Sequence, residues 1–576
     1  MRKLGILVLV VLALAVRGFW LGRFPGGVSH DDLVYVMSSK MLYLRGVDVS
    51  GVGFPQLLFG SNTEGVISPV PALLLVPYYG PMRLSLDLAR WPFVILNLLT
   101  AVGVYVLVRI MKATKGWAMA AATAFAFNPW SLYLSRLTTD TAFALFFGVW
   151  GMAGLLWYRG RRLIWPGIFL GLVFFSYQGA KVLIIPMAVV VLGYRAWVAK
   201  TLPWRQFFCF VAAMGALMGA FLVGQKVVPM SVVASRGGEI IFLDKGALSS
   251  QVNDDRRLTL VNPFVQWEAN KAVAAVSDTL RNYLSVWSGP VFFVSGDPTP
   301  LNNFSRQGLF YAVDVVFLGA GILAFWQSRR REFYLLTGLL VIAPLPAAIH
   351  TGSLSIINRG FLLLPVMEVF IGAGIILIYS GLARLGGKTV AGLILGLVMA
   401  ISLGNFEYYY FFQNPVLSQE TFFVSDRVVA NILTRENYQQ KVEVVLDSPP
   451  AVWLEAVFYA PGNDQNRILR QEGENFMNGI FRIGNTEFVS RCPVKFDPGV
   501  TYIVKNDCGK NLNPDAVITD RHYGGAIYKI YNDKLCRGVN LDVWFRFYYP
   551  ADYEMEKMSN EDFCRRWINA PVVNGV

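Results

Sequence analysis

Two adjacent carboxylates, Asp31 and Asp32, follow the first apolar stretch of the chain, within the segment Phe24–Tyr35. Adjacent carboxylates repel each other, and burial of such a pair raises the pKa of one member. A carboxylate tuned in this way can act as a general base at a membrane surface. The alternative is structural: Asp31 caps a helix over Leu33–Arg45, and Asp32 lies in its first turn, where the helix dipole favours an acid.

Basic residues next to apolar segments are the second group of candidates. Arg136 and Asp140 stand four residues apart, which suits an ion pair on a helix or an arginine that binds an anionic group. Lys181 and Arg359 each adjoin another apolar segment. A lysine at such a boundary either extends its charge into the water layer or holds a phosphate as a point charge.

His30 and His350 are the candidates for metal binding. His30 directly precedes Asp31, so a site with histidine and aspartate ligands is one interpretation. The chain has no HExxH motif, no CxxC pair and no Asp-rich calcium loop, which favours the other interpretation, a hydrogen-bonding histidine. A divalent metal is thus a possible cofactor, and the sequence requires none.

Apolar segments of membrane-spanning length must position these residues. The chain has 576 residues, of which 55% are hydrophobic and 15% charged, and its mean hydropathy is +0.46. This composition excludes a disordered chain, a coiled coil and an ordinary cytosolic enzyme, and it predicts a polytopic α-helical membrane protein. We expect about eleven helices, over residues 4–20, 91–110, 117–134, 141–157, 163–177, 180–198, 206–228, 308–326, 333–350, 360–380 and 389–406.

Basic residues in short loops predict the orientation of these helices. One alternating set of segments carries sixteen basic residues, with Glu332 as the one acid beside them; these residues are Arg2, Lys3, Arg109, Lys112, Lys115, Arg159, Arg161, Arg162, Arg195, Lys200, Arg205, Arg329, Arg330, Arg331, Arg384 and Lys388. Positive loops stay in the cytoplasm. The N-terminus is therefore expected inside and the C-terminal part outside the plasma (inner) membrane, with the first helix retained rather than cleaved as a signal peptide.

The domain organisation follows from the same pattern. We expect a transmembrane domain over 1–406, with outer loops at 21–90 and 229–307, and an extracytoplasmic α/β domain over 407–576. A helix is expected over Ser425–Asn437, and strands over Val442–Leu446 and Tyr502–Lys505. Residues 411–576 carry 18 basic and 21 acidic residues, so the basic excess belongs to the membrane part and does not indicate nucleic-acid binding.

Four of the five cysteines lie in this C-terminal part, at Cys492, Cys508, Cys536 and Cys564. Their clustering in a polar domain predicts two disulfides and an oxidising compartment. The three possible pairings stay open.

The order of these motifs resembles that of the GT-C glycosyltransferases that use polyprenyl-phosphate sugars, a group that includes protein O-mannosyltransferases and lipid A aminoarabinose transferases. Their mark is an acidic pair in the first outer loop, here Asp31 and Asp32. The likeness spans residues 1–410 and includes the segments Gly65–Tyr79, Ala89–Arg90, Pro129–Asp140, Ser176–Lys181, Gly296–Pro298 and Asn358–Arg359. The second acid is more usually glutamate, the WWDYG signature of oligosaccharyltransferases is absent, and the tail lies outside the resemblance.

The resemblance implies an inverting membrane glycosyltransferase of the cell envelope, moving a hexose or pentose from a polyprenyl phosphate to a hydroxyl of a protein, glycan or lipid. Asp31 would be the base, and Asp32 would orient the acceptor or tune Asp31. Arg136, Lys181 and Arg359 would bind the donor phosphate. Supporting positions are His30, Asp140, Tyr177 and Glu64.

Two other classes of protein stay open. A transporter or flippase of lipid-linked sugars would also suit basic residues at the outer face, but it should show internal repeats and mid-membrane charges, and neither is evident. A non-catalytic assembly protein would tolerate loss of Asp31 and Asp32 and depend on its tail.

Overall fold

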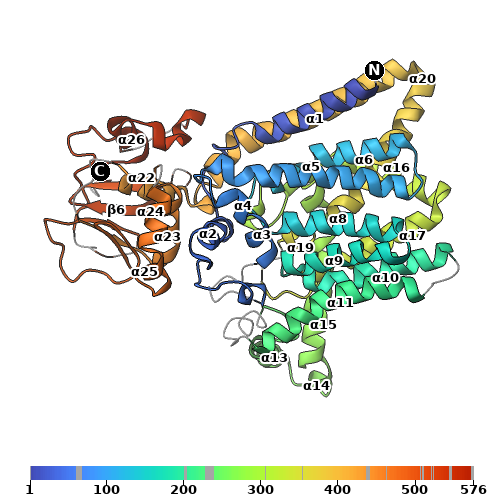
Figure 1. Ribbon diagram of the computed structural model, residues 1–576, viewed down its shortest axis with the longest axis horizontal. Coiled ribbons are helices and arrows are strands. Elements are labelled where there is room, and N and C mark those ends of the chain that lie inside the picture. Colours follow the sequence, from blue (N-terminus) through green and yellow to red (C-terminus); the bar gives the residue numbers. More distant parts are fainter. Residues whose placement is uncertain are drawn as a thin grey trace. The chain divides into compact units, whose positions relative to one another are not determined.

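The computed structural model describes the chain except for residues 1, 60–67, 200–203, 228–238, 305, 353–354, 436–440, 462–463, 506–507, 509–511, 521, 523, 544–547 and 572–576. The chain forms two compact units (Figure 1). The first, here called the helical unit, comprises Met1–Gly18, Pro55–Pro71 and Phe93–Tyr410. The second, the mixed unit, comprises Phe19–Phe54, Ala72–Pro92 and Phe411–Val576.

Each expected apolar segment is helical over most of its length. These helices are α1 (Arg2–Gly18), α5 (Leu86–Ile110), α6 (Lys115–Phe127), α7 (Pro129–Leu134), α8 (Thr141–Trp157), α9 (Ile164–Ser176), α10 (Ala180–Ala199), α11 (Trp204–Val227), α16 (Asp314–Ser328), α17 (Arg330–Ile342), α18 (Leu345–Ala348) and α20 (Leu363–Tyr408). Within the described residues, four helical stretches are long and apolar enough to cross a membrane: Leu86–Ile110, Ala180–Val198, Arg330–Ala348 and Leu363–Leu417. The shorter apolar helices are Gly5–Gly18, Thr141–Trp157, Phe207–Val223 and Asp314–Ser328.

Two boundaries differ from the expected spans. The segment 117–134 is broken between α6 and α7, because Asn128 adopts an extended conformation and its side chain caps α7, whose first residue is Pro129. The last two expected helices are joined as α20, with Gly387 at φ 85° marking the kink between them. Glycine accommodates that left-handed conformation without steric cost.

Glycines let two of these helices approach closely. A Cβ added at Gly321 of α16 would lie 1.8 Å from the carbonyl oxygen of Phe370 in α20. A Cβ added at Gly374 of α20 would lie 1.8 Å from the carbonyl oxygen of Phe317 in α16. Such reciprocal small-residue contacts are typical of helix packing in membranes.

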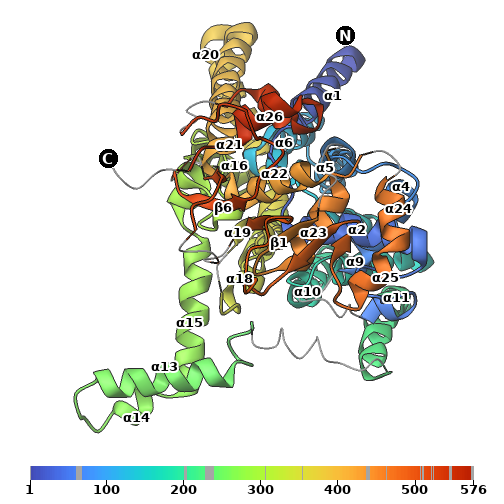
Figure 2. The same ribbon diagram turned by 90° about the vertical axis from the view of Figure 1, so that its left-hand side faces the viewer.

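The described part of the second expected outer loop contains α-helices. It contains α13 (Lys245–Leu258), α14 (Val265–Glu268) and α15 (Lys271–Val286), and Figure 2 shows α13 and α15 joined at an angle through α14. The buried side chains of Ile241, Leu248, Val252, Ala274 and Ala275 form a small core between α13 and α15.

The mixed unit contains one six-stranded sheet. Its strands are β1 (Val442–Val445), β2 (Arg482–Ile483), β3 (Thr486–Val489), β4 (Thr501–Val504), β5 (Ala516–Thr519) and β6 (Ala526–Tyr531), in the order β2-β3-β1-β4-β6-β5. The central strand β1 is parallel to β3 and β4, and the other pairs are antiparallel. The α-helices that lie wholly within this unit, among the described residues, are α2 (His30–Arg45), α4 (Val76–Tyr79), α21 (Asn414–Leu417), α22 (Val424–Leu433), α23 (Pro449–Phe458), α24 (Asp464–Gln471), α25 (Gly473–Met477) and α26 (Asn560–Trp567).

The fold class expected from the sequence, a polytopic helical protein with a C-terminal α/β domain, is confirmed in its helices and its sheet. The strands β1 and β4 lie within one residue of where the sequence predicts them. The helix α22 ends at Leu433, earlier than the expected helix over Ser425–Asn437, whose last residues lie outside the described part of the chain. The cysteines pair as Cys492–Cys508 and Cys536–Cys564, which resolves the three alternatives that the sequence leaves open.

Candidate functional site

The acidic pair lies at the start of α2, in the mixed unit. Ser29 caps this helix, because its side-chain oxygen accepts a hydrogen bond from the Asp32 amide at 3.2 Å. The helix begins at His30, so the structural alternative in which Asp31 caps a helix from Leu33 is wrong. Asp31 and Asp32 both lie in the first turn; Asp31 is exposed, and Asp32 is buried.

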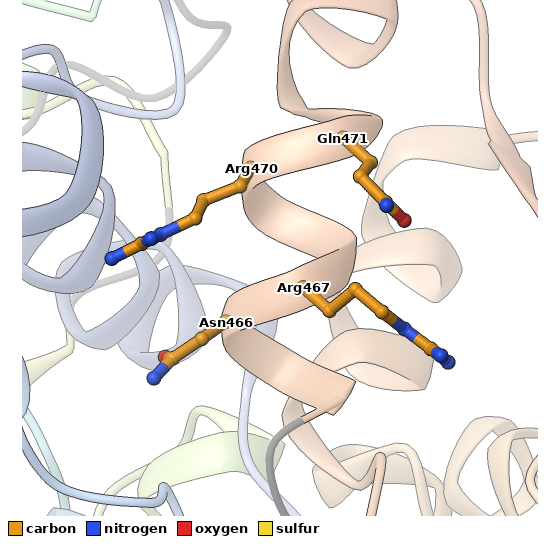
Figure 3. A pocket seen from close by; sticks show the side chains of 4 residues that line it. All are labelled: Asn466, Arg467, Arg470 and Gln471. Atoms are coloured by element: carbon orange, nitrogen blue, oxygen red, sulfur yellow. The ribbon is translucent and has the colours of Figure 1, made fainter.

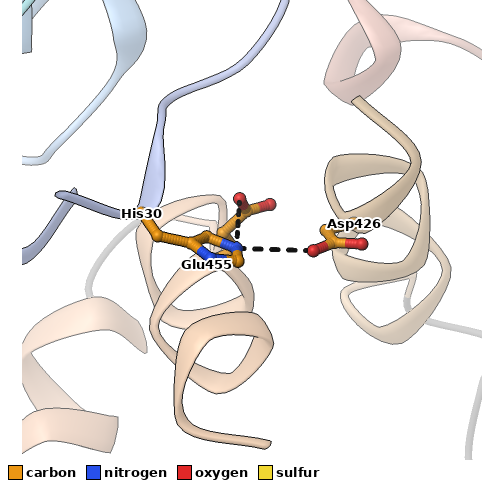
Figure 4. Close-up of side chains that lie close together, drawn as sticks. All are labelled: His30, Asp426 and Glu455. Carbon is orange, nitrogen blue, oxygen red and sulfur yellow. Dashed lines mark ion pairs between the residues drawn. The ribbon is translucent and has the colours of Figure 1, made fainter. Parts of the chain in front are cut away.

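Two acids from the C-terminal part of the mixed unit approach His30 (Figure 4). The His30 Nε2 atom lies 3.5 Å from Asp426 Oδ2 of α22 and 4.0 Å from Glu455 Oε1 of α23. Figure 4 shows all three side chains pointing toward one another. His30 is the first residue of α2, Asp426 belongs to α22 and Glu455 to α23. The His30 ring stacks on Phe423, with 3.6 Å between ring centroids, so its orientation is fixed.

The two carboxylates of this cluster have different electrostatic environments. Burial raises the pKa of Glu455 well above its ordinary range, and the charge of Asp426 raises it further. Burial acts on Asp426 in the same direction, but the adjoining His30 ring, the charge of Lys505 and the Tyr528 hydroxyl outweigh it and lower the pKa of Asp426. Lys505 Nζ and the Tyr528 hydroxyl both donate to Asp426 Oδ1, at 3.0 and 2.7 Å.

The helical unit brings together several of the motifs that the sequence analysis separates. The Trp130 indole N–H donates to the Ile357 carbonyl at 3.1 Å, which ties α7 to α19 (Ile356–Arg359). Asp297 Oδ2 accepts from the Ile357 amide at 2.8 Å, and Ser68 Oγ donates to Asp140 Oδ2 at 2.7 Å. The segments containing Ser68, Trp130–Asp140, Asp297 and Ile356–Arg359 therefore meet in this unit.

Arg136 and Asp140 do not lie on a common helix. They occupy the irregular turn between α7 and α8, so their spacing is not that of a helical ion pair. Arg136 is 1% exposed, and its Nη1 donates to the Arg17 carbonyl at 2.7 Å. Its guanidinium also lies over the Tyr410 ring, 5.5 Å from the centroid.

Lys181 and Arg359 are half-buried, unlike Arg136. Lys181 Nζ lies 4.2 Å from the centroid of the Phe221 ring, a cation–π distance. Tyr177, in the turn before α10, packs edge-on against Phe361, with 6.2 Å between centroids, so the segment 176–181 approaches the chain directly after Arg359.

His350 has a different environment from His30. Its Nε2 lies 2.7 Å from Arg359 Nη2 and 3.3 Å from Glu239 Oε2, and its Nδ1 accepts from the Gly352 amide at 2.8 Å. Within the described part of the chain, the His30 cluster is the group of three histidine, cysteine or acidic side chains close enough to share one metal ion. Glu64 lies outside the described residues.

Asp426 and Glu455 are not among the site residues predicted from the sequence. Glu455 has a local signal, since it stands alone among apolar residues in the helix Pro449–Phe458 and is 1% exposed. An isolated acid on an otherwise apolar helix is rarely buried without a partner, and that pattern could have marked it. Asp426 has no comparable signal, because α22 is an ordinary amphipathic helix in sequence.

A separate hollow of about 390 Å³ lies along α24, lined by Asn466, Arg467, Arg470 and Gln471 (Figure 3). Asn466 and Arg470 point to one side of the helix, and Arg467 and Gln471 to the other. None of these residues belongs to the motifs above.

Comparison with known proteins yields structural matches only. No protein-family profile and no curated protein sequence matches the chain. The structure of ArnT from Cupriavidus metallidurans bound to undecaprenyl phosphate is similar at 10% identity and a TM-score of 0.47, over 88% of this chain and 94% of ArnT. The oligosaccharyltransferase AglB from Archaeoglobus fulgidus, in complex with an inhibitory peptide and a dolichol-phosphate, is similar at 12% identity and a TM-score of 0.40, over 88% of this chain and 70% of AglB.

Proposed function

We propose that this chain is an inverting glycosyltransferase that moves a sugar from a polyprenyl phosphate to a hydroxyl acceptor at a membrane surface. The observation that carries the proposal is the meeting of separate motifs in the helical unit. Segments from four parts of the sequence, at Ser68, Trp130–Asp140, Asp297 and Ile356–Arg359, are linked by direct hydrogen bonds. We therefore favour the interpretation that the four segments form one ligand-binding site over the interpretation that they are loops with separate roles.

The cations of this unit suit a phosphate leaving group. A lipid phosphate is a weak base, so its departure calls for positive charge rather than a proton donor. Lys181 and Arg359 are half-buried and keep part of their surface exposed, and we assign the phosphate to them. Arg136 is buried and bonded to the Arg17 carbonyl, so we assign it the role of positioning the turn between α7 and α8.

Asp31 is the proposed base. Its carboxylate is exposed in the first turn of α2, whereas that of Asp32 is buried. In the proposed step, Asp31 takes the proton of the acceptor hydroxyl, whose oxygen bonds to the anomeric carbon. The bond between that carbon and the phosphate oxygen breaks, and the electron pair leaves with the polyprenyl phosphate.

A transfer assay with matched aspartate variants tests this proposal. Purified full-length chain in lipid vesicles is given a panel of radiolabelled polyprenyl-phosphate sugars together with cell-envelope extract as the acceptor source. We expect Asp31→Asn to lower the transfer rate at least about 100-fold, the usual contribution of a general base. Asp464→Asn is the control, because Asp464 is also an aspartate in the first turn of a helix of the mixed unit.

Three outcomes contradict the proposal in different ways. Equal transfer by wild type and Asp31→Asn would show that Asp31 is not the base, although the chain would still be a glycosyltransferase. Unchanged transfer after Lys181→Ala and Arg359→Ala would show that these two residues do not bind the donor phosphate. Movement of intact donor across the vesicle membrane, with no transfer of label to any acceptor, would identify a flippase instead.

A further inference from the structure

We propose that His30, Asp426 and Glu455 bind one divalent transition-metal ion of the zinc or manganese type. The site lies wholly within the mixed unit, where the first residue of α2 meets α22 and α23. The inference concerns binding and stability, and it does not depend on the proposed transfer reaction.

The three ligand atoms lie close enough together to share one ion after small movements of the side chains. Ligands held at about 2.0–2.2 Å around a tetrahedral zinc ion stand roughly 3.3–3.6 Å apart. His30 Nε2 lies 3.5 Å from Asp426 Oδ2 and 4.0 Å from Glu455 Oε1, and all three ligand atoms lie within 4.8 Å of one another. A hydrogen bond between nitrogen and oxygen is shorter, at about 2.7–3.2 Å.

The unpartnered atoms of the cluster point independently to a cation. Asp426 is 0% and Glu455 is 1% exposed. Asp426 Oδ2, both carboxylate oxygens of Glu455 and His30 Nε2 have no hydrogen-bond partner among the described residues. Buried carboxylate oxygens normally have donors, because burial without them is costly. A divalent ion at the centre of the cluster would satisfy these atoms together.

The surrounding residues orient the ligands as those around metal sites usually do. Lys505 and Tyr528 both donate to Asp426 Oδ1, which leaves Oδ2 facing His30. The Phe423 ring stacks on the imidazole and fixes its plane. Outer partners of this kind set ligand geometry and affinity in metal sites.

The ligand set indicates the class of ion. One imidazole nitrogen with two carboxylates suits zinc or manganese, whereas calcium and magnesium prefer oxygen ligands alone. His350 offers an internal contrast. It also lies beside a glutamate, Glu239, but Arg359 Nη2 approaches its Nε2 at 2.7 Å, and a guanidinium there repels a metal ion.

Metal stoichiometry of the full-length chain is the first test. The protein is purified in detergent, stripped with a chelator, and reloaded with zinc or manganese at pH 7.5. Elemental analysis is expected to give about one ion per chain, and reloading is expected to raise the unfolding temperature. Less than one-tenth of an ion per chain after reloading, with an unchanged unfolding temperature, would overturn the proposal.

Glu455→Gln separates metal binding from a proton-only explanation. A neutral Glu455 would also account for the burial, and glutamine has the shape of the protonated acid. The metal proposal therefore expects Glu455→Gln to weaken binding at least about 100-fold while the metal-free protein folds as wild type. The proton-only explanation expects the metal content and the metal response of this variant to equal those of wild type.

His350→Ala is the matched control, and it is expected to keep the full metal content. His30→Ala is expected to lose the metal together with the rise in unfolding temperature. Retention of about one ion per chain by both His30→Ala and Glu455→Gln would place the ion elsewhere and contradict the proposal.

Discussion

Glu420 adds a third acid, half-buried, to the side chains around Asp426. Burial raises the pKa of Glu420 to about 7, an effect that the hydrogen bond from Ser425 partly opposes. Glu455 is shifted in the same direction by burial and by the charge of Asp426. The charged groups that face these acids come from several elements of the mixed unit, and they are His30, Asp426, Arg427, Lys505 and Asp520.

The raised pKa of Glu420 predicts how stability depends on pH in the metal-free protein. The folded state holds this proton more tightly than the unfolded chain, so its contribution is complete below the ordinary glutamate pKa and is lost as pH rises toward about 7. We expect the free energy of unfolding of the wild type to fall from pH 4.5 to pH 8, and the unfolding temperature to fall with it. In Glu420→Gln the fall in free energy is expected to be smaller by up to about 3 kcal/mol.

Glu474→Gln, at an exposed glutamate of the same unit, is the control and should leave the slope unchanged. If stability depends on pH as strongly in Glu420→Gln as in wild type, the raised pKa assigned to Glu420 is wrong. With metal bound the pH dependence should reverse, because protons compete with the ion for His30 and Glu455.

Single residues could be predicted from sequence only where the chemistry is local. The pair Asp31 and Asp32 is visible because its members are neighbours, and His30 is visible beside them. Asp426 and Glu455 lie about 400 residues further along the chain, and only folding brings them within 4.0 Å of His30. Such a contact cannot be inferred from the spacing of residues in the sequence.

The helices could be predicted from the sequence because apolar periodicity is a local property. The start of α2 shows the limit. Asp31 is the one cap considered from the sequence, whereas the cap is the residue whose side chain reaches the amide three residues on. Ser29 does so, and its cap fixes the turn that presents Asp31.

Removal of this cap should loosen the first turn of α2. Ser29→Ala is expected to cost about 1 kcal/mol locally, and Ser29→Thr a fraction of that, because threonine keeps the hydroxyl. Hydrogen exchange measured by mass spectrometry on a peptide covering residues 29–36 would show faster exchange in Ser29→Ala.

Ser559→Ala is the matched control, since Ser559 caps α26 in the same way, with its Oγ accepting from the Asp562 amide at 3.1 Å. That variant should speed exchange in α26 and leave α2 unchanged. Equal exchange in wild type and Ser29→Ala would show that tertiary packing, and not the cap, holds the start of α2.

At the scale of the whole chain, composition and charge predicted the class of protein but not its compact units. Residues 19–54 and 72–92 belong to the same unit as the sheet, although they precede it by several hundred residues. Loop composition gives no sign of that association, and the pairing of the four cysteines likewise depends on tertiary contacts. Basic loops, by contrast, make a definite prediction about topology.

Orientation can be tested with single cysteines at highly exposed positions. Cys209 is the one cysteine outside the two disulfides, so Cys209→Ala provides the background. Leu385 lies among the predicted cytoplasmic basic residues, Val261 in the second predicted outer loop, and Ile480 in the C-terminal part; they are 89%, 104% and 55% exposed. Positive loops stay inside, so a membrane-impermeant maleimide on intact cells should label Val261→Cys and Ile480→Cys, and label Leu385→Cys only after permeabilisation.

Labelling of Leu385→Cys alone would show that the orientation is the reverse of the predicted one. Labelling of Val261→Cys without Ile480→Cys would mean an odd number of crossings between them, where the sequence predicts four.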